Sequence, residues 1–131
     1  MQTWKKKITR SEAIRPNRGR AMPFLRLTKS GMIHDHTTWF RICFFSSLSW
    51  KRNINQAENL RVQIEVTILG THFGSRTMRI DYDPERSGHH SAPTIHLYYD
   101  SNTKGVLLKN DMTGRYVHLT EKDGLFFFKI V

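Results

Sequence analysis

Hydrophobic and polar residues alternate strictly between residues 60 and 68. The apolar positions Leu60, Val62, Ile64, Val66 and Ile68 are separated by Arg61, Gln63, Glu65 and Thr67. Alternation with a period of two is typical of a β-strand that buries one face. This segment is therefore predicted to be a half-buried strand.

A hairpin is predicted directly after this strand. Gly70 and Gly74 bracket a short polar stretch, and a second alternating run then places Met78, Ile80 and Tyr82 on one face. We expect two antiparallel strands joined by a loop of about four or five residues.

Shorter apolar runs predict further strands at residues 24–27, 38–45, 94–99, 116–119 and 125–130. The run at 38–45 is apolar on nearly both faces, and one helical turn is expected at 106–108. Short strands at this spacing favour a sandwich or a barrel. The predicted fold class is all-β, a seven- or eight-stranded open barrel with at most one or two short helices.

The chain divides into two predicted parts. Residues 1–22 are polar and basic with almost no periodicity, so we expect a basic N-terminal arm, followed by a single β-barrel domain at residues 23–131. A chain of 131 residues has the size of one domain. Residues 83–93 lack apolar alternation and are expected to form a long loop.

The positive charge of the chain is regional. Residues 1–61 hold 13 Lys and Arg against three acids, whereas residues 62–131 hold eight of each, so the whole net charge of +10 lies in the first half. A one-sided field of this size favours a polyanionic partner, most commonly nucleic acid. A basic surface without a dedicated partner, an anionic membrane and an acidic protein are the alternatives.

The residue types of the basic half suit DNA contact. Arginine reads guanine with two hydrogen bonds, asparagine reads adenine, serine and lysine hold phosphate, and a tryptophan beside two cations can stack on a base. A plain tether that binds phosphate without sequence preference is the alternative. The candidate DNA-binding residues here are Arg10, Ser11, Arg15, Asn17, Arg18, Arg20, Lys29, Arg41, Trp50, Lys51 and Arg52.

The single cysteine and the absence of long apolar runs limit the setting of the protein. Cys43 cannot form an internal disulfide, lies in an apolar run and is expected to be buried. We expect a cytoplasmic protein, because cysteine use is low, no stretch approaches the roughly 20 apolar residues of a membrane span, and no secretory signal follows Lys5–Lys7.

Metal binding and catalysis have weaker support in the sequence. His34 and His36 could be two metal ligands, and His89 and His90 with His96 could add a third, but no cysteine pair or zinc motif accompanies them, so no metal or cofactor is expected. No complete nuclease motif is present, and we expect no enzymatic activity. A small metal-independent ribonuclease that uses His and Arg as acid and base is the alternative.

Several short motifs, taken in order, carry a resemblance to a known family. Together they resemble the C-terminal region of restriction endonucleases whose catalytic part is phospholipase D-like, over residues 11 to 130. The motifs are Ser11-x-Ala13-x-Arg15-x-Asn17, Leu25-Arg26-Leu27-Thr28-Lys29, Trp39-Phe40-Arg41, Val66-Thr67-Ile68-Leu69-Gly70, Pro84-x-Arg86, Thr94-x-His96-Leu97 and Thr113-Gly114-Arg115.

This resemblance implies a B3-like DNA-binding pseudobarrel that grips the major groove of double-stranded DNA with two arms. Residues 10–20 would form one arm, and the loop at 83–93 would form the other, with Arg86, Ser87, His89 and His90 facing the groove. The acidic residues at 81–85 sit badly against phosphate, although an acid can accept from cytosine.

The expected function is therefore that of a double-stranded DNA-binding module, with RNA a less suitable partner. The chain lacks a nuclease domain, so we expect a freestanding reader or the specificity part of a restriction-type system with a separate nuclease subunit. A ribonuclease and a protein-interaction module with an incidentally basic face are the two alternatives.

Overall fold

Eight strands and two short helical segments make up the described part of the fold. The computed structural model describes residues 1–10, 12–13, 24–27, 37–52, 57–87 and 93–131, with the backbone alone for 84–87 and 93–94. The elements are β1 (Gln2–Lys7), β2 (Phe24–Arg26), the π-helical turn η1 (Phe40–Phe44), β3 (Lys51–Arg52), β4 (Glu58–Ile68), β5 (Thr71–Ser87), β6 (Pro93–Tyr98), α2 (Ser101–Leu107), β7 (Tyr116–Lys122) and β8 (Leu125–Ile130).

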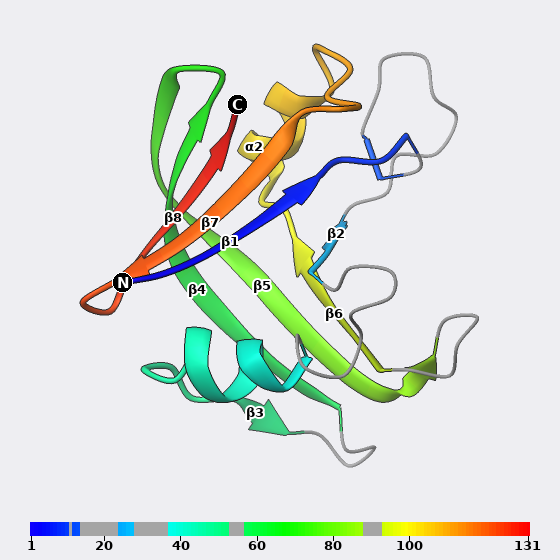
Figure 1. The fold of residues 1–131 in the computed structure, drawn as a ribbon, viewed down its shortest axis with the longest axis vertical. Helices are drawn as coiled ribbons and strands as arrows, with labels where there is room; N and C mark the ends of the chain where they lie inside the picture. The colour runs from blue at the N-terminus through cyan, green and yellow to red at the C-terminus, as the bar shows by residue number, and fades with distance from the viewer. Residues whose placement is uncertain (11, 14–23, 28–36, 53–56, 88–92) are drawn as a thin grey trace.

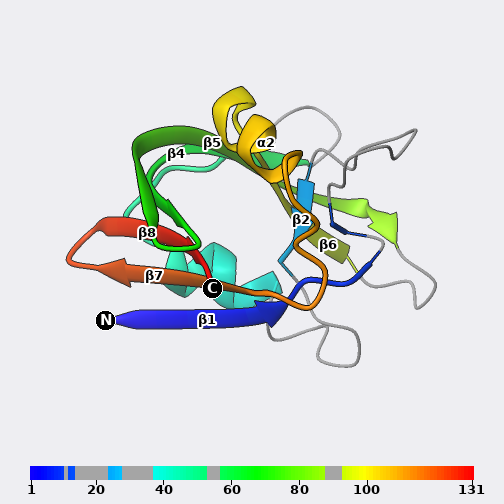
Figure 2. The same ribbon diagram turned by 90° about the horizontal axis from the view of Figure 1, so that it is seen from above.

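Seven of the strands form one curled sheet in the order β1-β7-β8-β4-β5-β6-β2, and β3 pairs separately with β4 (Figure 1). Among the pairings of the described strands, only β4–β8 is parallel. Figure 2 shows the strands around a common interior, with β7 and β8 on one side and β2 and β6 on the other. The predicted all-β open barrel with two short helices is confirmed.

The core fills the interior of this barrel. The apolar positions of β4 that alternate in the sequence are all buried, as predicted. Phe40, Phe44 and Phe45 are each at most 1% exposed. Their rings contact Trp4 of β1 and Phe126 of β8, so the aromatic cluster joins the helical segment to both strands.

The strand predicted at residues 38–45 is wrong, because this segment is helical from Thr37 to Phe44. Its buried residues Thr37, Phe40 and Phe44 recur at three- and four-residue intervals, which is the period of a helix. The intervening Ile42 and Cys43 lie on the outer face and are exposed. The expectation that Cys43 is buried is wrong for the same reason.

The β4–β5 hairpin is present, but its loop is shorter than predicted. The turn consists of Leu69 and Gly70, whose φ angles of 49° and 85° belong to a two-residue type I′ turn. The register then shifts, since Val66 pairs with Gly74 and Thr67 pairs with His72, so a bulge follows the turn. The glycines that suggested one long loop therefore serve a turn and a bulge.

Two segments predicted to be irregular contain strand. Residues 2–7 of the predicted arm form β1, which pairs with β7 and buries Trp4 and Lys6. β5 continues to Ser87 and β6 begins at Pro93, so the predicted loop at 83–93 is wrong for residues 83–87. Residues 88–92, between them, lie outside the described part. No helix within the described residues is long and apolar enough to span a membrane.

Candidate nucleic-acid interface

The outer face of β4, β5, β6 and β2 carries a row of residues that are paired across the strands. Arg61 pairs with Arg79, Arg79 with Tyr98, and Tyr98 with Phe24. Directly paired residues point to the same side of a sheet. The row therefore places two exposed arginines side by side next to two aromatic rings.

A second row runs parallel to the first. Its members, in strand order, are Lys51, Asn59, Asp81, His96 and Arg26. Lys51 and Arg26 are exposed, as are both arginines of the first row. We call this surface the arginine face; it comprises Phe24, Arg26, Lys51, Asn59, Arg61, Arg79, Asp81, His96 and Tyr98.

Ring contacts hold the centre of the arginine face. The ring of Phe24 stacks on His96, with centroids 4.0 Å apart and planes 8° from parallel. The guanidinium carbon of Arg79 lies 4.2 Å from the centroid of Tyr98. Because the donors of a guanidinium lie in its own plane, stacking on Tyr98 orients Arg79 without using its N–H groups.

The two predicted arms attach at opposite ends of the arginine face. The segment 14–23 enters β2 at Phe24, which pairs with Tyr98 at the end of β6, whereas the segment 88–92 enters β6 at Pro93. Tyr98 is five residues after Pro93, which is roughly 17 Å along the strand at about 3.4 Å per residue. This span is larger than the roughly 12 Å width of the DNA major groove.

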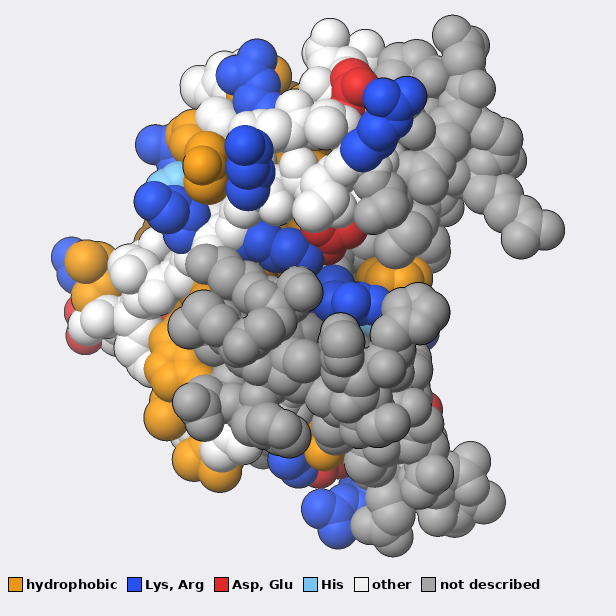
Figure 3. Space-filling model, turned by 45° about the vertical axis from the view of Figure 1, so that its right-hand side comes forward, with side chains coloured by type: hydrophobic (Ala, Val, Ile, Leu, Met, Phe, Trp, Pro, Cys, Tyr) orange, Lys and Arg blue, Asp and Glu red, His pale blue; other side chains and the backbone are white. Residues whose placement is uncertain are grey.

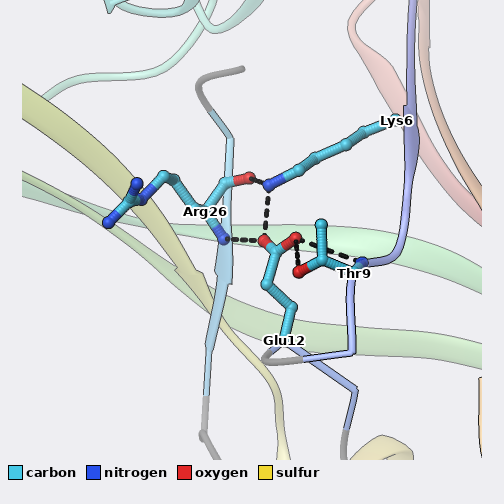
Figure 4. Close-up of polar contacts among 4 residues, drawn as sticks. All are labelled: Lys6, Thr9, Glu12 and Arg26. Atoms are coloured by element: carbon cyan, nitrogen blue, oxygen red, sulfur yellow. Dashed lines mark hydrogen bonds and ion pairs between the residues drawn. The ribbon is translucent and has the colours of Figure 1, made fainter. Parts of the chain in front are cut away.

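A buried ion pair anchors the base of the N-terminal arm (Figure 4). Lys6 of β1 pairs with Glu12 and donates to the Arg26 carbonyl of β2 at 2.8 Å. Glu12 also accepts from the Arg26 amide at 3.3 Å and from the Thr9 hydroxyl at 2.9 Å. The contacts fix the backbone of Arg26, and they place Lys6 in the interior rather than on a DNA-binding surface.

A second group of predicted residues gathers around the carboxylate of Glu58. Arg41 pairs with Glu58, and its guanidinium carbon lies 4.1 Å from the ring centroid of Tyr82. Arg52 approaches the same carboxylate at 3.5 Å and keeps 60% of its side chain exposed, against 27% for Arg41. Arg52 is therefore far more open to a ligand than Arg41.

The indole of Trp50 takes part in packing. Its Nε1 donates to the Arg41 carbonyl at 3.3 Å, and its ring meets Phe45 edge-on at a centroid distance of 6.2 Å. The side chain is half-buried. The contacts orient the backbone next to Lys51 and Arg52, both of which are exposed.

The structure places only part of the predicted site. Arg10 is exposed three residues after the end of β1, and Arg86 and Ser87 belong to β5 by their backbone. Sequence reasoning overlooked Arg26, Arg61 and Arg79, although all three occupy alternate, outward positions of predicted strands. The predicted residues outside the described part are Ser11, Arg15, Asn17, Arg18, Arg20, Lys29, His89 and His90.

The described histidines do not form an acid–base pair. From His72 to His118 the register passes through Thr67 and Lys129, three strand spacings or about 14 Å. His96 lies on β6, where it is buried and stacks on the ring of Phe24. In the described ranges, no three His, Cys, Asp or Glu side chains are grouped to hold a metal ion.

No family model matches the chain, and neither does any curated protein or solved structure.

Proposed function

We propose that this protein binds double-stranded DNA through its arginine face and the two segments attached to the ends of that face. The observation that carries the proposal is the cross-strand pair Arg61–Arg79. Like charges directly opposite each other destabilise a sheet. A bound phosphate backbone would offset that repulsion, because Arg donors bind phosphate oxygens with charge-assisted hydrogen bonds.

The regional charge supports the same partner. The +10 of the chain lies in residues 1–61, which include the arm, Arg26, Lys51 and Arg61. Figure 3 shows many Lys and Arg side chains and few Asp and Glu over the described surface of one face. A cationic surface of this kind attracts a polyanion from a distance and raises the association rate.

The spacing of the two attachment points favours a duplex of B form. Segments that begin at two points roughly 17 Å apart can flank the edges of a major groove. The major groove is wide in B-DNA, whereas in A-form RNA it is too narrow for side chains to enter. The B3-like resemblance implies the same two-armed grip on a barrel. In a restriction-type system, cleavage would then belong to a separate subunit.

The test is a titration of a labelled 20-base-pair duplex by fluorescence anisotropy over a series of salt concentrations. Contact with about six phosphates gives a slope of roughly −5 in log K against log salt. The double variant Arg61→Ala, Arg79→Ala should lower affinity and make the slope shallower by about 2.

The matched control is Lys122→Ala, Lys129→Ala, which removes the same charge from β7 and β8, across the barrel from β2 and β6 (Figure 2). This control should leave the slope close to that of the parent. A salt-independent parent, or equal losses in the two double variants, would contradict binding through the arginine face.

A further inference from the structure

The outer face of β8 exposes apolar side chains. Leu125 is 63% exposed and Phe127 is 37% exposed, and Lys129 follows them on the same face. They line one wall of a groove of about 640 Å³ between β8 and the β4–β5 hairpin. We call it the β8 groove. Exposed large apolar side chains that line a groove mark a binding surface.

A row of basic side chains extends from this groove across three strands. Lys5 of β1 pairs with His118 of β7, and His118 pairs with Lys129 of β8. Neighbouring strands lie about 4.8 Å apart, so the three side chains form a continuous line. Burial lowers the pKa of His118, and the charges of Lys5 and Lys129 lower it further, which shows a positive potential along the row.

The side of the groove that β4 and β5 form is polar and carries a carboxylate. His72 lies between two partners, with Nε2 3.2 Å from a Glu65 carboxylate oxygen and Nδ1 3.2 Å from the Thr67 hydroxyl. The only carboxylate among the residues that line the groove is therefore on the β4–β5 side. The basic row lies on the β1–β7–β8 side. A ligand in the groove would meet opposite charges on its two flanks.

We propose that the β8 groove binds an acidic segment of a partner protein that also carries apolar side chains. Its apolar side chains would pack on Leu125 and Phe127, and its carboxylates would face Lys5 and Lys129. Nucleic acid suits this surface less well, because Lys129 is the only Lys or Arg among the described residues that line the groove, and the exposed leucine offers no stacking plane. Mixed apolar and charged contacts of this kind are typical of protein–protein interfaces.

The groove borders the arginine face along β4 and β5, because its lining residues Gln63 and Ser75 share the outer side of these strands with Arg61 and Arg79. None of the arginine-face residues is among the described residues that line the groove, so a peptide in the groove need not contact Arg61 or Arg79. The proposal does not depend on DNA binding, and each can fail alone.

The test is a selection of displayed random 12-residue peptides on the full chain, with the double variant Phe127→Ser, Lys129→Glu as the counter-selection target. Peptides enriched on the parent should combine Asp or Glu with Leu, Phe or Trp. Their synthetic forms should bind the parent at least about tenfold more tightly than the variant, because a central aromatic anchor and a charge partner are both lost.

The control variant is Arg61→Ala, Arg79→Ala, to which the selected peptides should bind as they do to the parent. The proposal is overturned if no peptide prefers the parent to the Phe127→Ser, Lys129→Glu variant. It is also overturned if Lys129→Ala alone lowers the affinity for duplex DNA as much as Arg61→Ala does, since the groove would then be part of a nucleic-acid surface.

Discussion

Lys6 and Glu12 form a buried ion pair at the gap between β1 and β2, the two edge strands of the curled sheet. No backbone ladder between β1 and β2 is among the described pairings, and the side chains bridge these edges instead, because both also bond to the backbone of Arg26. Burial raises the pKa of Tyr99, and the negative charge of Glu12 raises it further. The pair therefore links the two edge strands of the open barrel by side-chain contacts next to Arg26.

Removing one member of this pair should destabilise the protein strongly. Glu12→Gln leaves the Lys6 ammonium buried without its counter-charge, and such changes cost about 3–5 kcal/mol. The double variant Lys6→Met, Glu12→Leu removes both charges and should recover much of that loss. Urea unfolding followed by tryptophan fluorescence measures both. A single variant as stable as the parent would contradict a closing role for the pair.

The helical segment gives a second stability prediction with an internal control. Phe44→Ala removes a side chain that is 1% exposed and leaves a cavity among aromatic rings, so about 3–5 kcal/mol should be lost. Ile42→Ala, two residues earlier, alters a side chain that is 64% exposed and should change stability by less than about 0.5 kcal/mol. If residues 38–45 formed a two-faced buried strand instead, the two variants would cost similar amounts.

The same segment shows why part of the fold escaped prediction. Strict alternation in β4 identified its buried face, because a half-buried strand has one period that no helix shares. Between residues 38 and 45, Ile42 and Cys43 fill the outer helical face with apolar residues, so the sequence looks apolar on both sides of a strand. The spacing of Phe40 and Phe44 was the available signal for a helix. At residues 4–8 the buried positions are Trp4, Lys6 and Ile8, and the lysine interrupts the apolar alternation that would have predicted β1.

The candidate site was predictable in part. Net charge drew attention to the first half of the chain, where Arg26, Lys51 and Arg61 of the arginine face lie. The pairing of Arg79 with Arg61 was not predictable, because the two are far apart in sequence and only the β4–β5 register places them side by side. Whether a basic residue is open or used in packing also depends on tertiary contacts, as the pairing of Arg41 with Glu58 shows.

The pKa of His118 predicts a loss of stability in mild acid. The folded protein lowers this pKa below the ordinary value near 6.5, so the unfolded chain binds the proton more readily. The stabilising contribution is present above pH 6.5 and is lost as the pH falls through the folded pKa. Urea midpoints at pH 7.5 and pH 5 should differ less in His118→Gln than in the parent.

The last prediction separates base reading from phosphate contact. Arg15 and Asn17 have the side chains that read guanine and adenine, and a good base contact discriminates by about 1–3 kcal/mol. Arg15→Ala and Asn17→Ala should therefore relax sequence preference in a randomised duplex pool.

Arg61→Ala should weaken all sequences alike, because contacts to phosphate carry no sequence information. Lys7 is exposed on β1, so Lys7→Ala should behave like Arg61→Ala if β1 also contacts the phosphate backbone of the DNA. Sequencing of the bound pool decides between the two kinds of loss. Uniform losses for Arg15→Ala and Asn17→Ala would make the N-terminal arm a tether, and base reading would then have to come from another part of the chain.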